Sequence, residues 1–323
     1  MRIAILGAGA VGSYFGGRLA QSGEDVVWFA RGATLEVLRS RGLEVKSLKG
    51  DFVLPPQRAT DRPEDVGRVD AVILGVKAWQ VPEAARDLAG WLGPESLVLP
   101  LQNGVDAVDQ LRRTLGPEPV VGGVCKIVCE VVEPGHVRHF GAEPRVELGP
   151  WRDPGEEAAR CERQRERCQR LQLAFSRAGV AARVHDDVRV AAWEKFLFIA
   201  SLSAVGAVTG LTVGALRSRP ETRELLRRAM AEVETLARSC GVPLAPDVVA
   251  RSLGFADGLA AESTSSMQRD IAAGRPSELD SLCGAVVCLA RERGLEAPVH
   301  AELHLSLRAR GRRAPTSGPP APG

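Results

Sequence analysis

The sequence predicts an α/β domain with a parallel sheet, followed by an all-helical domain. Three observations predict it: a glycine-rich turn joins a strand-like run to a helical segment at the start, strands then alternate with helices, and strand-like runs cease after residue 186. We therefore expect the α/β domain at 1–186 and the helical domain at 187–311. Residues 312–323 are rich in Pro, Gly and Ser and are expected to be a disordered tail.

The glycine-rich turn has the pattern G-x-G-x-x-G, with its first strand at Ile3–Leu6 and its helix at Ser13–Gln21. In a Rossmann-type domain these glycines permit the tight turn, the approach of a pyrophosphate and close packing of helix on strand, and the helix N-terminus attracts the phosphates. A plain glycine turn is the alternative. The expected cofactor contacts are Gly7, Ala8, Gly9, Ala10, Val11 and Gly12.

The second strand is expected at Asp25–Ala30, and Arg31 follows it directly. An NAD site usually carries an acid at this place for the ribose 2′-hydroxyl, whereas an arginine suits the 2′-phosphate of NADP. The sequence thus favours NADP(H) over NAD; an exposed loop arginine is the alternative.

Two further buried strands are expected at Val69–Lys77 and Leu97–Leu101. Lys77 and Asn103 lie at their carboxyl ends, the edge at which open α/β sheets bind ligands. Asn103 has a second interpretation as a turn residue before Gly104.

The rest of the first domain follows from apolar periodicity and turn residues. We expect a helix at 34–42, short strands and turns at 43–60, a helix at 81–92, strand-like runs at 120–148 with a turn at 133–135, a surface helix within 152–178 whose charges form a solvated face, a last strand at 180–185, and a linker near 186–187.

The second domain is predicted to contain helices only. A long apolar helix is expected at 188–207, and a capping box at Ser218–Glu221 opens a helix that ends at Cys240 before Gly241. Further helices are expected at 246–259, 263–273, 277–293 and 298–310.

Composition excludes several functional classes. The net charge of +2 and the scattered arginines give no nucleic-acid footprint, and we find neither a long uninterrupted apolar run nor a signal peptide. The 7 cysteines lack metal-ligand spacing and are interpreted as reduced thiols of a cytoplasmic protein. His300 and His304 lie on one helix without a third ligand nearby, so we predict no metal site.

Lysine is rare in this arginine-rich chain, and Lys195 begins a strongly apolar helix. Burial disfavours the ammonium form, so its pKa is expected to fall toward neutrality, where it can give a proton to a carbonyl oxygen. A lysine that extends to solvent from a helix end is the alternative. The polar clusters 263–270 and 275–280 are further candidate site segments. The alternative interpretation of these clusters is helix capping by Ser263 and Ser277.

Several motifs together resemble those of the ketopantoate reductase (2-dehydropantoate 2-reductase) family. They are Gly7–Gly12, Val76-Lys77-Ala-Trp-Gln80, Leu101-Gln-Asn-Gly104, Trp193-Glu-Lys195 and Ser265-Ser-Met-Gln-Arg-Asp270 followed by Glu278-Leu-Asp280. The resemblance covers residues 1 to about 310. It implies NADPH-dependent reduction of 2-dehydropantoate to pantoate in pantothenate biosynthesis.

The resemblance also implies roles for single residues. Lys195 would be the general acid, held by Glu278, which also reaches the cofactor ribose. Arg31 and Lys77 would hold the 2′-phosphate, Asn103 would lie beside nicotinamide and substrate, and Ser266 would bind the substrate carboxylate.

The chain departs from the family pattern at three places where asparagine is common, which here hold Ile199, Ser203 and Ser263. Because a site built to pair polar groups discriminates strongly, these changes can redirect specificity. The alternatives are therefore a reductase of a different 2-oxo acid, with Ser203 and Ser263 lining its substrate site, or an NADP-binding regulatory protein with degraded catalysis. The oligomeric state, a homodimer included, stays open.

Overall fold

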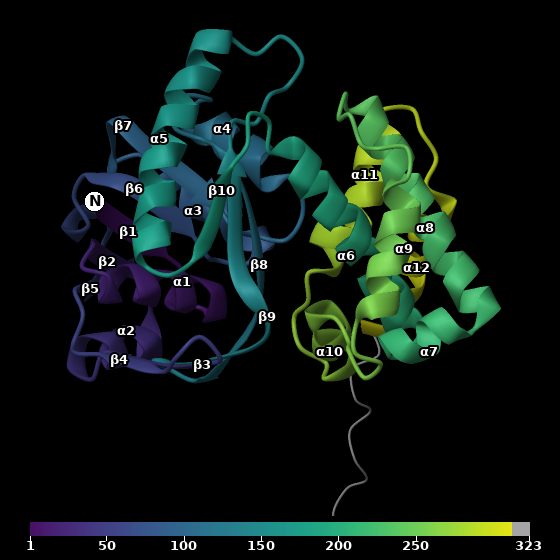
Figure 1. Cartoon of the computed structure of the whole chain (residues 1–323), viewed down its shortest axis with the longest axis horizontal. Helices are drawn as coiled ribbons and strands as arrows, with labels where there is room; N and C mark the ends of the chain where they lie inside the picture. The colour runs from purple at the N-terminus through teal and green to yellow at the C-terminus, as the bar shows by residue number, and fades with distance from the viewer. Residues whose placement is uncertain (312–323) are drawn as a thin grey trace, which may run out of the picture. The chain divides into compact units, whose positions relative to one another are not determined.

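The computed structural model describes residues 1–311, and the predicted tail at 312–323 lies outside them. The chain divides into two compact units, Met1–Ala192 and a second that begins at Trp193, so the division falls inside helix α6 (Arg189–Thr209). The first unit contains the sheets and the second is helical (Figure 1). The predicted fold class, a Rossmann-like α/β domain with a helical C-terminal domain, is confirmed.

The first sheet of this unit is parallel and carries the strand order β5-β2-β1-β6-β7. Its strands are β1 (Arg2–Leu6), β2 (Asp25–Phe29), β5 (Ala59–Thr60), β6 (Val69–Leu74) and β7 (Leu92–Pro100). The helices that follow its strands are α1 (Ala10–Gln21), α2 (Gly32–Ser40), α3 (Val81–Leu88) and α4 (Ala107–Leu115), with the short turns η1 (Pro63–Asp65) and η2 (Ala78–Gln80).

A second sheet has the order β10-β9-β3-β4, with β8 paired to β9. Its strands are β3 (Leu43–Ser47), β4 (Phe52–Leu54), β8 (Gly122–Glu133), β9 (His136–Gly149) and β10 (Ala181–Val184). Apolar side chains of both sheets share one core with α1 and with α5 (Ala158–Arg177). This burial is the main force that holds the unit together.

Two details of the first unit differ from expectation. α1 begins at Ala10 rather than Ser13, because the helix starts directly from the glycine turn. β6 ends at Leu74, so Lys77 lies beyond the strand, at the start of η2, and not on its last residue.

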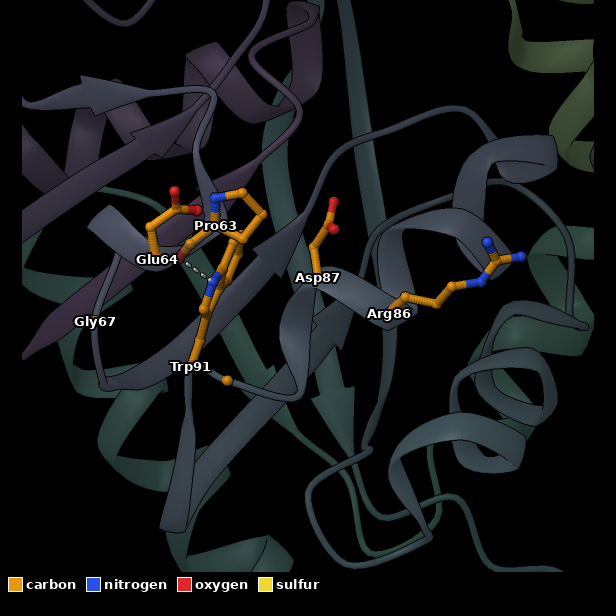
Figure 2. A pocket seen from close by; sticks show the side chains of 7 residues that line it. Pro63, Glu64, Gly67, Arg86, Asp87 and Trp91 are labelled. Carbon is orange, nitrogen blue, oxygen red and sulfur yellow. Dashed lines mark hydrogen bonds between the residues drawn. The ribbon is translucent and has the colours of Figure 1, made fainter.

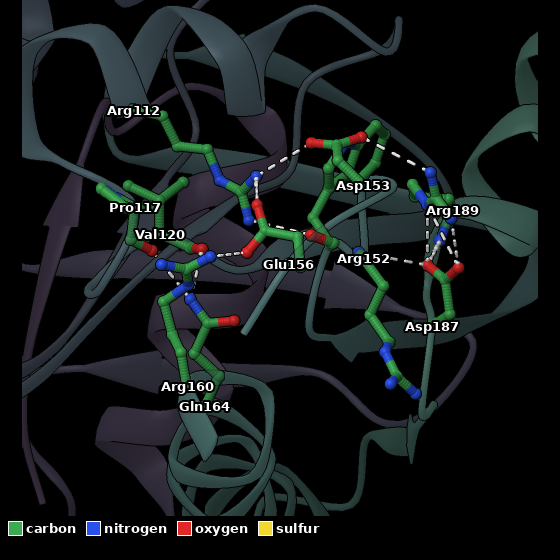
Figure 3. Close-up of polar contacts among 11 residues, drawn as sticks. Arg112, Pro117, Val120, Arg152, Asp153, Glu156, Arg160, Gln164, Asp187 and Arg189 are labelled. Carbon is green, nitrogen blue, oxygen red and sulfur yellow. Dashed lines mark hydrogen bonds and ion pairs between the residues drawn. The ribbon is translucent and has the colours of Figure 1, made fainter. Parts of the chain in front are cut away.

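The charges of α5 do not form only a solvated face. Arg167 is 4% exposed and donates to the carbonyl and carboxylate oxygens of Glu118. Gln164 is 1% exposed, and its amide donates to three backbone carbonyls, among them that of Val120 (Figure 3). The helix therefore fixes the segment that leads into β8.

Beyond α6, the second unit is built from helices within the described residues. They are α7 (Val213–Ser218), α8 (Pro220–Ser239), α9 (Val248–Gly258), α10 (Ser266–Ala272), the π-type turn η3 (Asp280–Gly284), α11 (Ala285–Glu292) and α12 (Pro298–Gly311). α8 ends at Ser239, one residue before the predicted end, with Cys240 as its C-cap and Gly241 at φ +70° after it.

The predicted capping box at Ser218 is wrong. Ser218 ends α7 and its hydroxyl donates back to the Ala215 carbonyl, while α8 begins at Pro220 without a side-chain cap. Likewise Ser265, not Ser263, caps α10, accepting from the Gln268 N–H at 3.0 Å. Local propensity located these helix starts to within a few residues but not their caps.

Helix α6, which was expected as a long apolar helix, is by length and composition apolar enough to cross a membrane. In its most apolar window 67% of the helix is buried inside the protein, as in the core helix of a globular unit.

Candidate cofactor and substrate sites

The turn after β1 is locked by glycines from two parts of the chain. Gly7 has φ +98°, and a Cβ at Gly12 would lie 2.0 Å from the Gly7 carbonyl oxygen. Gly75, which follows β6, would place a Cβ 2.9 Å from the same oxygen. These positions therefore accept only glycine without a backbone shift. Sequence reasoning missed Gly75, because its need for glycine comes from a distant strand.

Gly9 differs from these glycines because the space before it is open. A Cβ there would meet only the Gly75 carbonyl oxygen, at 3.8 Å. Gly9 is also the N-cap of α1, which has no side-chain cap and no acidic residue in its first turn. The N–H groups of Ala10, Val11 and Gly12 thus lie at a helix end suited to an anion, and the turn fits a dinucleotide pyrophosphate.

A buried glutamine just past the end of β7 supports this turn, which together with Gly75 we call the glycine cradle (Gly7–Gly12 and Gly75). The Gln102 amide donates to the carbonyls of Leu74 at 2.8 Å and Val76 at 3.0 Å, so it fixes the turn that contains Gly75. Its Oε1 atom is buried and has no hydrogen-bond partner among the described residues. The motif at residues 101–104 predicts Asn103 as a site residue. It gives no sign that Gln102 positions the turn. Asn103 follows β7 and is half-buried.

Arg31 lies at the carboxyl end of β2, as predicted, and 64% of its side chain is exposed. Its guanidinium lies 3.4 Å from a Glu83 carboxylate oxygen and 3.9 Å from one of Asp87, both on α3. Lys77 is also exposed, and its N–H donates to the Gln80 side chain. Arg31 and Lys77 therefore both lie near the carboxyl ends of the strands, and Arg31 is already paired with carboxylates of α3.

In the second unit, Lys195 lies near the start of α6 and is half-buried. Further along the same helix, Ile199 is half-buried, and Ser203 is 2% exposed. Ser201 is fully buried, and its hydroxyl has no hydrogen-bond partner within residues 1–311. From Trp193 onward the helix thus carries one cation, Lys195, and few other polar groups.

Helix α10 is fixed against α6 through a glycine. A Cβ at Gly206 would lie 2.7 Å from the Gln268 side-chain oxygen, and the Gln268 amide donates to the Leu211 carbonyl. Ser266, the first residue of α10, is exposed, while Ser263 is half-buried and its carbonyl accepts from the Val213 N–H. The geometry therefore leaves the Ser266 hydroxyl accessible at a helix start.

Glu278 is 7% exposed and directly precedes the helical segment that contains η3. Its carbonyl accepts from the Leu282 N–H at 2.9 Å. Such π-type turns are rare and occur frequently at functional sites, because they change the direction of side chains on the helix. The sequence predicted an ordinary helix here.

The two histidines considered for a metal contact different carboxylates. His300 Nδ1 lies 2.8 Å from Glu232, and His304 Nε2 lies 2.7 Å from Asp280. Among residues 1–311 no group of three His, Cys, Asp or Glu side chains is arranged to hold a metal. None of the 7 cysteines forms a disulfide, and burial raises the pKa of Cys168 and Cys283 to about 12.

Helix α6 begins in a network of ion pairs, shown in Figure 3. The Asp187 carboxylate accepts from the Arg189 N–H and guanidinium, and the Asp153 carboxylate lies between Arg189, at 3.4 Å, and Arg112, at 3.0 Å. Arg112 also donates to Glu156. The segment expected as a linker is therefore tied to α4 and to the loop before α5.

A shallow depression of about 300 Å³ lies elsewhere on the first unit (Figure 2). Its wall includes the Trp91 indole, which donates to the Pro63 carbonyl at 2.9 Å. The other lining residues are Glu64, Gly67, Arg86, Asp87 and Gly90. None of the predicted site residues lines it, and we assign it no ligand.

The sequence matches the model of the family described as Ketopantoate reductase PanE/ApbA over residues 3–153, and that of its C-terminal domain over residues 187–310. The chain belongs to the ketopantoate reductase family. It is 34% identical over 312 residues to the 2-dehydropantoate 2-reductase of Mesorhizobium japonicum, covering 90% of this chain and 92% of the relative. It is therefore an oxidoreductase that acts on CH–OH groups with a nicotinamide cofactor.

Solved structures agree with this assignment. The crystal structure of 2-dehydropantoate 2-reductase from Geobacter metallireducens has a TM-score of 0.85 and 31% identity, covering 96% of this chain and 99% of that one. A D-mandelate dehydrogenase bound to NADH and anilino(oxo)acetate has a TM-score of 0.83 and 24% identity, covering 97% and 98%. At that identity the second comparison supports the fold alone.

Proposed function

We propose that this chain uses NADPH to reduce the 2-keto group of 2-dehydropantoate, with Lys195 as the general acid. The observation that carries the proposal is the glycine cradle, whose open space at Gly9 faces an uncapped helix N-terminus. Family membership then supplies the class of reaction.

The preference for NADPH rests on Arg31. It follows β2, where the adenosine ribose lies in a Rossmann-type site, and the exposed guanidinium suits a 2′-phosphate. Lys77 would add a second positive charge at the same edge.

When bound, the nicotinamide would supply a hydride to the keto carbon, and a side chain of the protein would supply the proton. The Lys195 ammonium would donate its proton to the keto oxygen, so that the alkoxide charge never fully develops. Glu278, largely buried, would hold the ammonium in place and reach the cofactor ribose. Asn103 and Ser266 would position the nicotinamide and the substrate carboxylate, which reduces the entropy lost in reaching the transition state.

Reduction of a different 2-oxo acid is the second candidate. It is favoured by the residues at three positions expected to hold amides, since Ile199, Ser203 and Ser263 cannot make the same pairs of hydrogen bonds.

A panel of 2-oxo acids with NADPH, followed at the nicotinamide absorbance, tests the proposal. We expect turnover of 2-dehydropantoate with stoichiometric formation of a 2-hydroxy acid. Turnover of another 2-oxo acid alone would select the second candidate. NADPH binding without turnover of any acid would contradict both and favour a regulatory protein.

A further inference from the structure

One side of the glycine cradle is formed by the short turn that follows β6. A Cβ added at Gly9 would meet the Gly75 carbonyl oxygen at 3.8 Å, so this oxygen borders the open space before Gly9. Val76 continues the same turn and packs on Gly7, because a Cβ added at Gly7 would lie 2.7 Å from the Val76 backbone nitrogen. The position of residues 75–76 therefore sets how much room a pyrophosphate has at the cradle.

The backbone ladder of the sheet holds the beginning of this turn. The Gly75 N–H donates to the Leu6 carbonyl at 2.8 Å, and the Leu101 N–H donates to the Leu74 carbonyl at 3.1 Å. β6 ends at Leu74, so the Val76 carbonyl lies beyond the paired part of the strand. The far end of the turn therefore depends on a contact from outside the ladder.

Gln102 provides that contact. Its amide nitrogen donates to the carbonyls of Leu74 and Val76, which are the residues immediately before and after Gly75. A glutamine amide has two N–H donors, and both are used here on one turn. The side chain is 9% exposed, and its Oε1 atom has no hydrogen-bond partner among the described residues. Gln102 thus acts as a double donor to the turn.

The two hydrogen bonds restrain the Gly75 carbonyl from both sides. Hydrogen bonds are directional, so a donor shared by the two flanking carbonyls limits rotation of the peptide units between them. Gly75 has no Cβ that would restrict its own backbone, and the close approach to Gly7 and Gly12 excludes one. The restraint must therefore come from another residue.

We propose that Gln102 is a positioning residue for the nicotinamide cofactor, which keeps the glycine cradle at the width that the pyrophosphate needs. It acts through residues 75–76. The inference rests on the proposed function and deepens it, because it concerns cofactor binding at the same site. The pyrophosphate is common to NADPH and NADH, so Gln102 serves both cofactors equally, whereas Arg31 would serve the 2′-phosphate alone.

Fluorescence titration of the full chain with NADPH and with NADH tests this role. Gln102→Met keeps the length of the side chain but removes both donors. We expect the Kd of both cofactors to rise at least about tenfold, by factors that agree within about twofold, because two hydrogen bonds are lost. Gln102→Asn keeps the amide but is one methylene shorter and cannot span both carbonyls, so it should weaken both cofactors to a smaller extent.

Gln164 supplies a matched control in the same unit. It is 1% exposed, its amide donates to three backbone carbonyls within residues 117–120, and its Oε1 has no hydrogen-bond partner in the described part of the chain. Gln164→Met should therefore lower the urea midpoint about as much as Gln102→Met does. Both Kd values should stay within about twofold of the wild type, because residues 117–120 are not part of the cradle.

Three results would overturn the proposal. They are wild-type Kd values in folded Gln102→Met, an equal loss of affinity in Gln164→Met, and a loss confined to NADPH, which would place the effect at the 2′-phosphate. If Gln102→Met does not fold, Gln102→Asn decides by the same comparison. The titrations need no turnover, so a wild type that binds NADPH but reduces no 2-oxo acid contradicts the reductase alone. A wild type that binds neither cofactor overturns both.

Discussion

The glycine cradle after β1 and the helical unit that carries Lys195 differ in how locally their geometry is encoded. In the cradle, backbone atoms of one short turn approach so closely that glycine is required at Gly7 and Gly12. In the helical unit, the packing of one helix on another is determined by side chains from separate helices, such as that of Gln268 against Gly206. A local backbone requirement appears in the sequence as a glycine pattern. Contacts between side chains of separate helices produce no such pattern.

The largest expected effect separates two glycines of the cradle. Gly12→Ala places a Cβ 2.0 Å from the Gly7 oxygen, so we expect a loss of about 3 kcal/mol in the free energy of unfolding and no measurable NADPH binding. Gly9→Ala adds its methyl group to open space and should leave the unfolding free energy within about 0.5 kcal/mol. Its NADPH affinity should still fall about tenfold or more, because the phosphates can no longer approach.

Urea denaturation and fluorescence titration with NADPH measure the two quantities. Equal destabilisation by both substitutions would contradict the distinction between a packing glycine and a ligand-facing one.

Arg31→Ala tests the cofactor preference at the other end of the dinucleotide. Loss of a charge-assisted contact with the 2′-phosphate should weaken NADPH by about 10- to 100-fold and NADH by less than about threefold. Titration with both cofactors measures this, and equal losses would rule out the 2′-phosphate contact.

The helical unit offers a matching test of a side-chain partnership. Glu232 on α8 accepts from the Val299 and His300 N–H groups at the start of α12, and also contacts the His300 ring. Burial alone would raise its pKa, but these hydrogen bonds lower it below the ordinary 4.5. Glu232→Gln should cost about 1–2 kcal/mol of unfolding free energy at pH 7.

The pH dependence of this contribution has a definite sign. A carboxylate with a lowered pKa stabilises the fold fully above its ordinary pKa and loses that contribution as pH falls through the lowered value. Below pH 4.5 the wild type should therefore lose stability faster than Glu232→Gln in urea titrations. Parallel curves would show that the ionised carboxylate contributes nothing.

The smallest expected effect concerns the carboxylates beside Arg31. Glu83 lies 3.4 Å from the guanidinium and both groups are exposed, so the pair is weak and would compete with a 2′-phosphate. Glu83→Gln should tighten NADPH by about two- to fivefold and leave NADH unchanged. Glu36→Gln removes an exposed charge of α2 that forms no ion pair with Arg31 and serves as control. Tightening of both cofactors would indicate a general charge effect.

The sequence predicted the fold class, the alternation of strands and helices along the first unit and the long helix α6, because apolar periodicity and glycine turns are local signals. It missed Gln102 and Gly75, whose roles depend on contacts with strands far away in the chain. The π-type turn η3 was missed as well, because nothing in its residues marks a change from an ordinary helix. The roles of Lys195, Glu278 and Ser266 remain predictions from family resemblance.

The central claim is that Lys195 supplies the proton in an NADPH-dependent reduction. The most direct measurement compares the wild type with Lys195→Ala in two assays, NADPH titration and turnover of the best 2-oxo acid. We predict an NADPH Kd within about threefold of the wild type and a kcat lower by about 10²-fold or more, the usual effect of losing a positioned acid. An unchanged kcat in a variant that binds NADPH normally would contradict the account.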